Sequence, residues 1–303
     1  MFKKVFVSVL VAFPVMAMAQ GVAHGTGVVK TAAVDLGYET FGVRGAELPV
    51  IAVNGGPGLS HVYMLENDMW EKVAAKRLVV FYDQRGTGAS KRVAAGASQG
   101  MEAQVADLEA VRAKLGLEKF ALVGDSYGGL LAMAYAAAHP EHVAKMVLSD
   151  SAAPAWKDIV HLLPEVFPDI EEEDAAAEKR LGEGTDAAAR EGMRQHFRMI
   201  FYSPEKRDEY MAKMGGLGFE PKVAEAVSKA TAGIDLTGKL AGFRMPVLVI
   251  TGRYDVNVAP LTAWRMAKAI PGAKLVFFEK SGHLPSYEEP EKYQEVLEGF
   301  LGL

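Results

Sequence analysis

A serine flanked by glycines, at the junction between an apolar run and an alanine-rich run, most constrains the fold of this chain. Residues 120–123 predict a short buried strand, and residues 130–138 predict a helix, since alanine and leucine favour helices. Between them stands Gly-Asp-Ser-Tyr-Gly-Gly at positions 124–129. A strand that turns directly into a helix needs very small flanking residues, so that the two elements can approach each other. We therefore expect Ser126 to lie at a strained strand-to-helix turn with an exposed hydroxyl.

Apolar runs and helical repeats alternate along much of the chain. Apolar residues recur at helical spacing from Met101 to Leu115, and Gly116 follows as a stop signal. Strands are expected at residues 27–34, 36–43, 50–53, 78–82, 120–123, 146–149, 247–251 and 275–278. Continuous apolar strands that alternate with helices predict an α/β fold, with a mostly parallel sheet and helices on both of its faces.

The segment 152–242 interrupts this alternation. It contains no convincing strand, and its stretches rich in alanine, methionine and charge, such as residues 187–201, predict helices. We expect a helical cap inserted between the two parts of the core, residues 20–151 and 243–303. The acidic run at 171–174 predicts a solvated helix start, since carboxylates are favoured near a helix N-terminus.

Residues 1–19 differ in composition from the rest of the chain. Two lysines precede the apolar run 5–16, and Ala-Met-Ala follows at positions 17–19. This order is typical of a secretory signal peptide, and the apolar run is shorter than the roughly 20 residues that span a bilayer. We expect cleavage after Ala19 and a periplasmic or secreted mature protein, without stable membrane insertion.

Charge and cysteine content exclude several classes of site. The net charge of −5 and the isoelectric point near 5.9 leave no basic patch, so no nucleic-acid partner is expected. The absence of cysteine excludes disulfides and thiolate metal sites. No His-Glu-x-x-His or comparable spacing occurs, so neither a metal nor another cofactor is expected.

A serine nucleophile needs a general base, and the base needs an acid that orients it. Reactive groups gather at the carboxyl ends of the strands in parallel sheets. Asp255 and His283 each follow one of the last two predicted strands, whereas the other six histidines lack such a position. The chain order nucleophile, acid, base then predicts the catalytic set Ser126, Asp255 and His283. Asp150 also follows a strand and is the alternative acid, while Asp125 is expected to point away from the nucleophile.

A glycine-rich loop, Asn-Gly-Gly-Pro-Gly at positions 54–58, follows another predicted strand. Such a loop leaves backbone N–H groups available for the oxyanion that forms when a hydroxyl attacks a carbonyl. We expect Gly55 or Gly56 to supply one donor of this oxyanion hole. The N–H of Tyr127 is expected to supply the other.

These blocks together resemble the α/β-hydrolases and, more narrowly, the proline iminopeptidase (prolyl aminopeptidase) family. The resemblance rests on the loop 54–58, Asp-Gln-Arg-Gly-Thr-Gly-Ala-Ser at 83–90, the serine motif 124–129, and Gly-Arg-Tyr-Asp at 252–255 with Ser-Gly-His at 281–283. It implies an α/β-hydrolase fold with an inserted cap, and a buried Arg85 network that supports the oxyanion loop. It also implies a serine hydrolase without a cofactor, a peptidase or amidase that releases N-terminal residues from short peptides or amino-acid amides.

Two departures from the family pattern concern the site and its substrate. Family members usually begin the oxyanion loop with histidine, whereas this chain has Asn54. Their cap glutamates near a Trp-x-x-Trp-Glu element hold the substrate's amino group, and no such element occurs in residues 152–242, where Glu165 and Glu183 are candidates. A carboxylesterase, a lactonase or a thioesterase would use the same three catalytic residues, and a non-catalytic hydrolase-fold binding protein is a further alternative.

Overall fold

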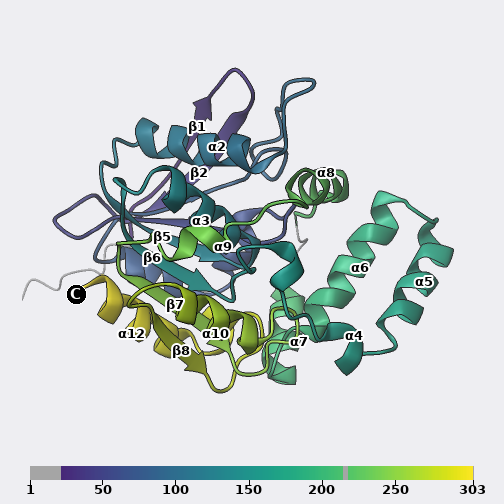
Figure 1. Cartoon of the computed structure of the whole chain (residues 1–303). Helices are drawn as coiled ribbons and strands as arrows, with labels where there is room; N and C mark the ends of the chain where they lie inside the picture. The colour runs from purple at the N-terminus through teal and green to yellow at the C-terminus, as the bar shows by residue number, and fades with distance from the viewer. Residues whose placement is uncertain (1–21, 214–217, 303) are drawn as a thin grey trace, which may run out of the picture.

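An eight-stranded sheet runs through the centre of the computed structural model, which describes residues 22–213 and 218–302 (Figure 1). Its strand order is β1-β2-β4-β3-β5-β6-β7-β8. β2 runs antiparallel to both of its neighbours, β1 and β4, and all other pairs of strands are parallel, so the sheet is mostly parallel, as predicted. The strands are β1 (His24–Lys30), β2 (Asp35–Phe41), β3 (Val50–Val53), β4 (Val79–Tyr82), β5 (Phe120–Asp125), β6 (Val143–Ser149), β7 (Val247–Gly252) and β8 (Lys274–Phe278).

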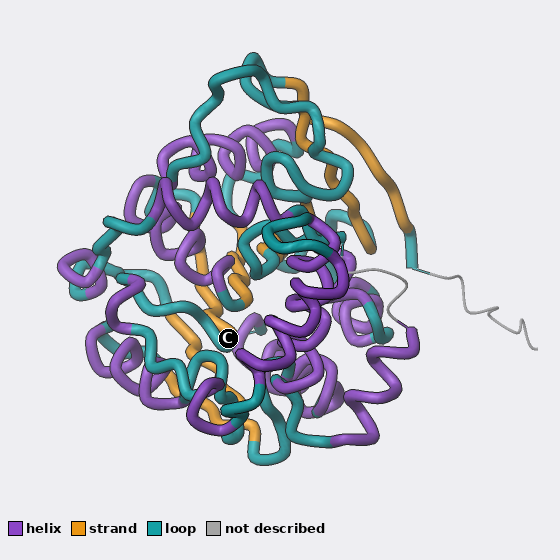
Figure 2. Tube along the Cα trace, turned by 90° about the vertical axis from the view of Figure 1, so that its right-hand side faces the viewer, coloured by secondary structure: helices purple, strands orange, loops and turns teal. Residues whose placement is uncertain are grey.

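Helices cover both faces of this sheet, so that the strands lie between two helical layers (Figure 2). The neighbouring residues Val50 and Ile51 of β3 belong to different apolar clusters, one on each face, as expected of a strand that is buried on both sides. One cluster includes residues of α2 (Met101–Lys114), α3 (Tyr127–Ala138) and α10 (Pro260–Ala269), and the other includes residues of α1 (Met69–Ala74) and α12 (Pro290–Leu301).

The described residues between β6 and β7 form helices, most of which lie on the right-hand side of Figure 1. These helices are η2 (Trp156–Asp158), α4 (Leu163–Val166), α5 (Ile170–Leu181), α6 (Asp186–Met199), α7 (Pro204–Lys213), α8 (Pro221–Thr231) and α9 (Thr237–Leu240). All of them fall within the predicted cap segment 152–242. Helix α5 carries three glutamates in its first turn, in line with the helix start predicted for the acidic run.

The structure differs from the predicted elements near the N-terminus. The first strand ends at Lys30 rather than at Val34, because the side-chain oxygen of Thr31 accepts from the N–H groups of Ala33 and Val34 and closes a turn. Helix α1 was not expected, since six residues are too few for a clear helical repeat. Two further short elements, η1 (His61–Leu65) and α11 (Pro285–Glu288), lie next to the site described below.

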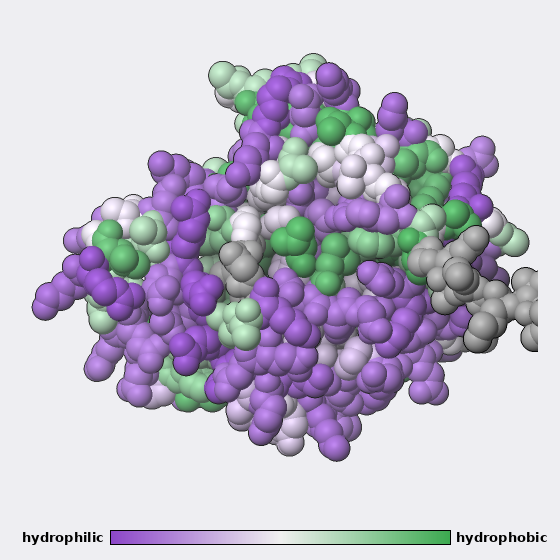
Figure 3. Space-filling view, turned by 180° about the vertical axis from the view of Figure 1, so that it is seen from behind, coloured by the Kyte–Doolittle hydropathy of each residue, from purple (hydrophilic) through white to green (hydrophobic). Residues whose placement is uncertain are grey.

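Most of the surface seen from behind consists of polar and charged residues (Figure 3). Apolar residues form small separate patches on it. Large exposed apolar side chains such as Val43, Tyr254 and Trp264 belong to different parts of the chain, as is normal for a folded protein. No described helix has both the length and the apolar character needed to cross a bilayer. The predicted signal peptide lies outside the described residues.

Candidate active site

Ser126 occupies a sharp turn between β5 and α3. Its backbone has φ 52° and ψ −120°, a conformation that costs a non-glycine residue about 1–3 kcal/mol. A Cβ at Gly124 would lie 2.4 Å from the carbonyl oxygen of Gly128, and one at Gly128 would lie 2.2 Å from a carbonyl oxygen of β3. The turn is held by hydrogen bonds from Ser126 N to Ser149 O (3.0 Å) and from Ala152 N to Ser126 O (2.9 Å). The predicted strand-to-helix turn is therefore present, and its glycines are required by close backbone contacts.

A chain of hydrogen bonds joins Ser126, His283 and Asp255. His283 Nε2 lies 3.1 Å from Ser126 Oγ, and His283 Nδ1 lies 2.7 Å from Asp255 Oδ2. The other carboxylate oxygen, Asp255 Oδ1, accepts from the N–H groups of Asn257 and Val258, both at 2.9 Å. Burial alone would lower the pKa of His283, but the Asp255 carboxylate outweighs burial and holds that pKa above its usual value. The structure thus brings the three predicted residues together, with the imidazole between the hydroxyl and the acid.

Asp150, the alternative acid, lies beside this chain of hydrogen bonds. One of its oxygens is within 4.8 Å of ligand atoms of Asp255 and His283. However, its Oδ1 accepts from the N–H of Gly252 (2.8 Å) and its Oδ2 contacts Ser149 Oγ (3.1 Å). Burial and the neighbouring Asp255 charge raise the pKa of Asp150 well above its usual value. Asp255, and not Asp150, therefore accepts the hydrogen bond of the imidazole.

The two glycines of the predicted oxyanion loop differ in their hydrogen bonding. Gly55 packs against Ser126, since a Cβ there would lie 2.7 Å from Ser126 Cβ, but its N–H donates to Tyr63 Oη (2.6 Å). The N–H of Gly56 has no acceptor among the described residues. Tyr127 is the first residue of α3, so its N–H has no partner within the helix. Of the two glycines, Gly56 is thus the one with an available donor.

The loop is supported differently from what the family resemblance implies. Arg85 is buried as expected, but its guanidinium bonds Asp107 (Nε to Oδ2, 2.7 Å) and two carbonyl oxygens near the start of α2. No described bond of Arg85 reaches the oxyanion loop. Instead, Gln84 Nε2 donates to Asn54 O (2.7 Å), and the Asn54 side chain donates to two carbonyl oxygens of its own loop. Gln84 and Asn54 therefore hold the loop directly, and Arg85 fastens the adjoining turn to α2.

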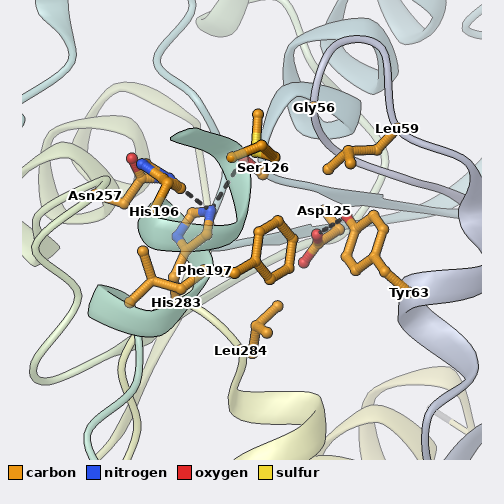
Figure 4. A pocket seen from close by; sticks show the side chains of 12 residues that line it. Gly56, Leu59, Tyr63, Asp125, Ser126, His196, Phe197, Asn257, His283 and Leu284 are labelled. Atoms are coloured by element: carbon orange, nitrogen blue, oxygen red, sulfur yellow. Dashed lines mark hydrogen bonds between the residues drawn. The ribbon is translucent and has the colours of Figure 1, made fainter. Parts of the chain in front are cut away.

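A small cavity of about 60 Å³ lies over Ser126, and residues of the helical segment between β6 and β7 form part of its wall (Figure 4). Helix α6 contributes Met193, His196 and Phe197 to its lining. His196 was not expected here, because it lies in a helix and does not follow a strand. Burial, together with the nearby imidazole of His283, lowers the pKa of His196 to about 4, so its ring is neutral at neutral pH.

Asp125 also lines this cavity, so the expectation that it points away from the nucleophile is wrong. It is the last residue of β5, at the end of the sheet where the cavity lies, and its Oδ2 accepts from the hydroxyl of Tyr63. Burial raises the pKa of Asp125 to about 6. By contrast, the candidate carboxylates Glu165 and Glu183 are exposed and do not line the cavity.

Comparison with known proteins agrees with this arrangement. The chain matches the α/β hydrolase fold family over residues 49–290. It is 32% identical over 269 residues to a proline iminopeptidase of Lactobacillus delbrueckii subsp. bulgaricus, covering 84% of this chain and 89% of the relative. A proline iminopeptidase of Saccharolobus solfataricus is 29% identical over 282 residues, covering 88% and 89%. A thermophilic esterase from Thermogutta terrifontis superposes with a TM-score of 0.69 at 26% identity, over 91% of this chain and 98% of that one. The chain therefore belongs to the α/β-hydrolase fold family, as a hydrolase that resembles the proline iminopeptidases.

Proposed function

We propose that this protein is a serine aminopeptidase or amidase that releases the N-terminal residue from short peptides or amino-acid amides. The observation that carries the proposal is the hydrogen-bonded series Ser126, His283 and Asp255 beside a cavity that Ser126 and His283 line. Its relatives named proline iminopeptidase support the choice of peptide or amide chemistry.

In the proposed mechanism, Ser126 Oγ attacks the substrate carbonyl while His283 Nε2 takes its proton. The same imidazole then donates that proton to the leaving amine, and Asp255 keeps the other proton on Nδ1. The N–H groups of Gly56 and Tyr127 stabilise the oxyanion, and one such donor is worth on the order of a hundredfold or more in rate. Water finally hydrolyses the acyl-enzyme, with His283 as the base.

A carboxylesterase is the second candidate. The same three residues cleave esters as well as amides, and the similarity to the Thermogutta terrifontis esterase favours this reading. The two candidates differ in what they demand of the acyl group, since an aminopeptidase requires a free α-amino group on it.

A panel of L-aminoacyl p-nitroanilides, tested beside p-nitrophenyl acetate and butyrate, separates these candidates. We expect turnover of at least one aminoacyl anilide, and loss of that turnover in Ser126→Ala with unchanged thermal unfolding. Turnover of the simple esters alone would overturn the aminopeptidase assignment in favour of the esterase. If no substrate is cleaved and a fluorophosphonate does not label Ser126, the result favours a non-catalytic hydrolase-fold binding protein over both enzymes.

We also propose that residues 1–19 direct export to the periplasm or beyond the cell. The proposal rests on the lysines, the apolar run and the Ala-Met-Ala sequence at positions 17–19. Expression of the full chain in a Gram-negative host, fractionation and intact-mass measurement test it. We expect the periplasmic protein to begin at Gln20, and recovery of the uncleaved chain from the cytoplasm alone would contradict the proposal.

A further inference from the structure

The carboxylate of Asp125 is only partly satisfied within the protein. Its Oδ2 accepts from Tyr63, and no described residue donates to its Oδ1. The residue is 6% exposed and lies in the wall of the cavity over Ser126. The site therefore offers an acceptor that a ligand can use.

Among the described residues at this site, Asp125 is the one acidic side chain whose carboxylate is not fully paired with protein donors. Asp255 is engaged by His283 and two backbone N–H groups, and His196 is neutral at neutral pH. None of the described residues that line the cavity is a lysine or an arginine. A positively charged group of a substrate would thus meet one carboxylate and no fixed cation.

Asp125 lies where it can bind a substrate group that is close to the scissile bond. An α-amino nitrogen is separated from the carbonyl carbon only by Cα, so the group that binds it must lie close to Ser126 Oγ. Asp125 precedes Ser126 directly and shares its cavity, whereas Glu165 and Glu183 are exposed. Building on the proposed function, we propose that Asp125, held by Tyr63, binds the protonated α-amino group of the substrate's N-terminal residue.

The surface next to the cavity also favours a positively charged ligand. Met193 also lines an adjoining cleft of about 480 Å³ between α5, α6 and α8. That cleft carries one lysine, Lys222, and four carboxylates, Asp174, Glu178, Asp186 and Glu225. A cleft with an excess of one sign of charge raises the local concentration of the opposite charge. Substrates with a protonated amine are therefore attracted toward Met193 and the cavity.

Two matched p-nitrophenyl esters, of L-alanine and of propionic acid, test the role of Asp125 because they differ only in the α-amino group. Asp125→Asn keeps the size of the side chain and removes its charge. We expect kcat/KM for the alanine ester to fall by about ten- to a hundredfold, mainly through KM, as befits the loss of a charge-assisted hydrogen bond. The propionyl ester should change less than about twofold. The control variants Glu165→Gln and Glu183→Gln should leave both values unchanged.

The outcomes separate this inference from the proposed function. If wild type cleaves aminoacyl anilides but Asp125→Asn slows both esters equally, the amine site is overturned and the aminopeptidase stands. If wild type cleaves no aminoacyl anilide, the proposed aminopeptidase function is itself overturned.

The wild-type protein provides a second test that does not depend on folding of the variant. Protonation of Asp125, whose pKa is raised to about 6, removes the negative charge that the amine needs. We expect the ratio of kcat/KM for the alanine ester to that for the propionyl ester to fall as the pH decreases from about 7 to about 5. Titration of His283 affects both esters and cancels in the ratio. A ratio that stays constant overturns the inference. The titratable groups around Asp125 are Tyr63, His196, His283, Asp150, Asp255, Tyr210 and Tyr293.

Discussion

The carboxylate of Asp255 serves two kinds of donor, and this makes Asp255→Asn an informative substitution. One oxygen faces His283 Nδ1, and the other accepts from the backbone N–H groups of Asn257 and Val258. An asparagine keeps the shape of the side chain but has a single acceptor oxygen. If that oxygen stays with the two backbone donors, the NH2 group faces Nδ1. The imidazole must then carry its proton on Nε2, where it cannot accept the proton of Ser126.

The hydrogen bonds decide which orientation of the asparagine prevails. A buried N–H that loses its acceptor costs about 1–3 kcal/mol, and turning the amide around would leave the N–H groups of Asn257 and Val258 without one. The wrong tautomer of His283 should therefore dominate. The expected loss is about 10⁴-fold in the rate of Ser126 acylation, equivalent to about 5 kcal/mol of activation free energy.

Asp150→Asn is the matched control, because Asp150 is buried beside the same histidine. Its oxygens bond Gly252 N and Ser149 Oγ rather than His283, and burial together with the Asp255 charge raises its pKa. We expect acylation to stay within about tenfold of wild type. The rate of fluorophosphonate labelling of Ser126, followed by intact mass, measures acylation without knowledge of the substrate, and circular dichroism checks folding. Near-normal labelling of Asp255→Asn, with a loss of several orders of magnitude in Asp150→Asn, would refute the reasoning.

Three further predictions concern pH and packing. Labelling of Ser126 should fall with decreasing pH through a pKa above 6.5, because His283 must be neutral to act as the base and its pKa is raised; half-maximal labelling below that pH would contradict this. Gly128→Ala should lower the melting temperature, since its Cβ would lie 2.2 Å from Val53 O, whereas Gly299→Ala, with open space around its Cβ, should not. Burial raises the pKa of Glu288, which accepts from three backbone N–H groups, from 4.5 to about 7. Ionising it in the folded state is therefore unfavourable, and the free energy of unfolding of wild type, relative to Glu288→Gln, should fall by about 3 kcal/mol between about pH 4.5 and pH 7 in urea titrations. A constant difference would show that Glu288 does not titrate in this range.

The order of strands and helices and the serine turn were predictable from the sequence because their causes are local. Apolar runs mark buried strands, and the glycines around Ser126 are needed where β5 meets α3. Asp255 and His283 were found by one general rule, that parallel strands end at the same edge of a sheet. The same rule selected Asp150 equally well, and it makes no prediction for residues in the helices of the cap.

Tertiary packing decided the remaining features of the site. Asp255 rather than Asp150 bonds His283 because the oxygens of Asp150 are taken by Gly252 and Ser149. Tyr63, brought in by η1, occupies the N–H of Gly55 and leaves Gly56 as the available donor.

The cavity itself depends on how the cap packs on the core. His196 faces Ser126 because α6 lies over the end of the sheet, and Asp125 faces the cavity because β5 ends there. A local pattern determines which element forms and where it ends. Which side chains meet depends on contacts between segments far apart in the sequence, such as the bond between Ser126 and His283, and those contacts exist only once the sheet and the cap have packed.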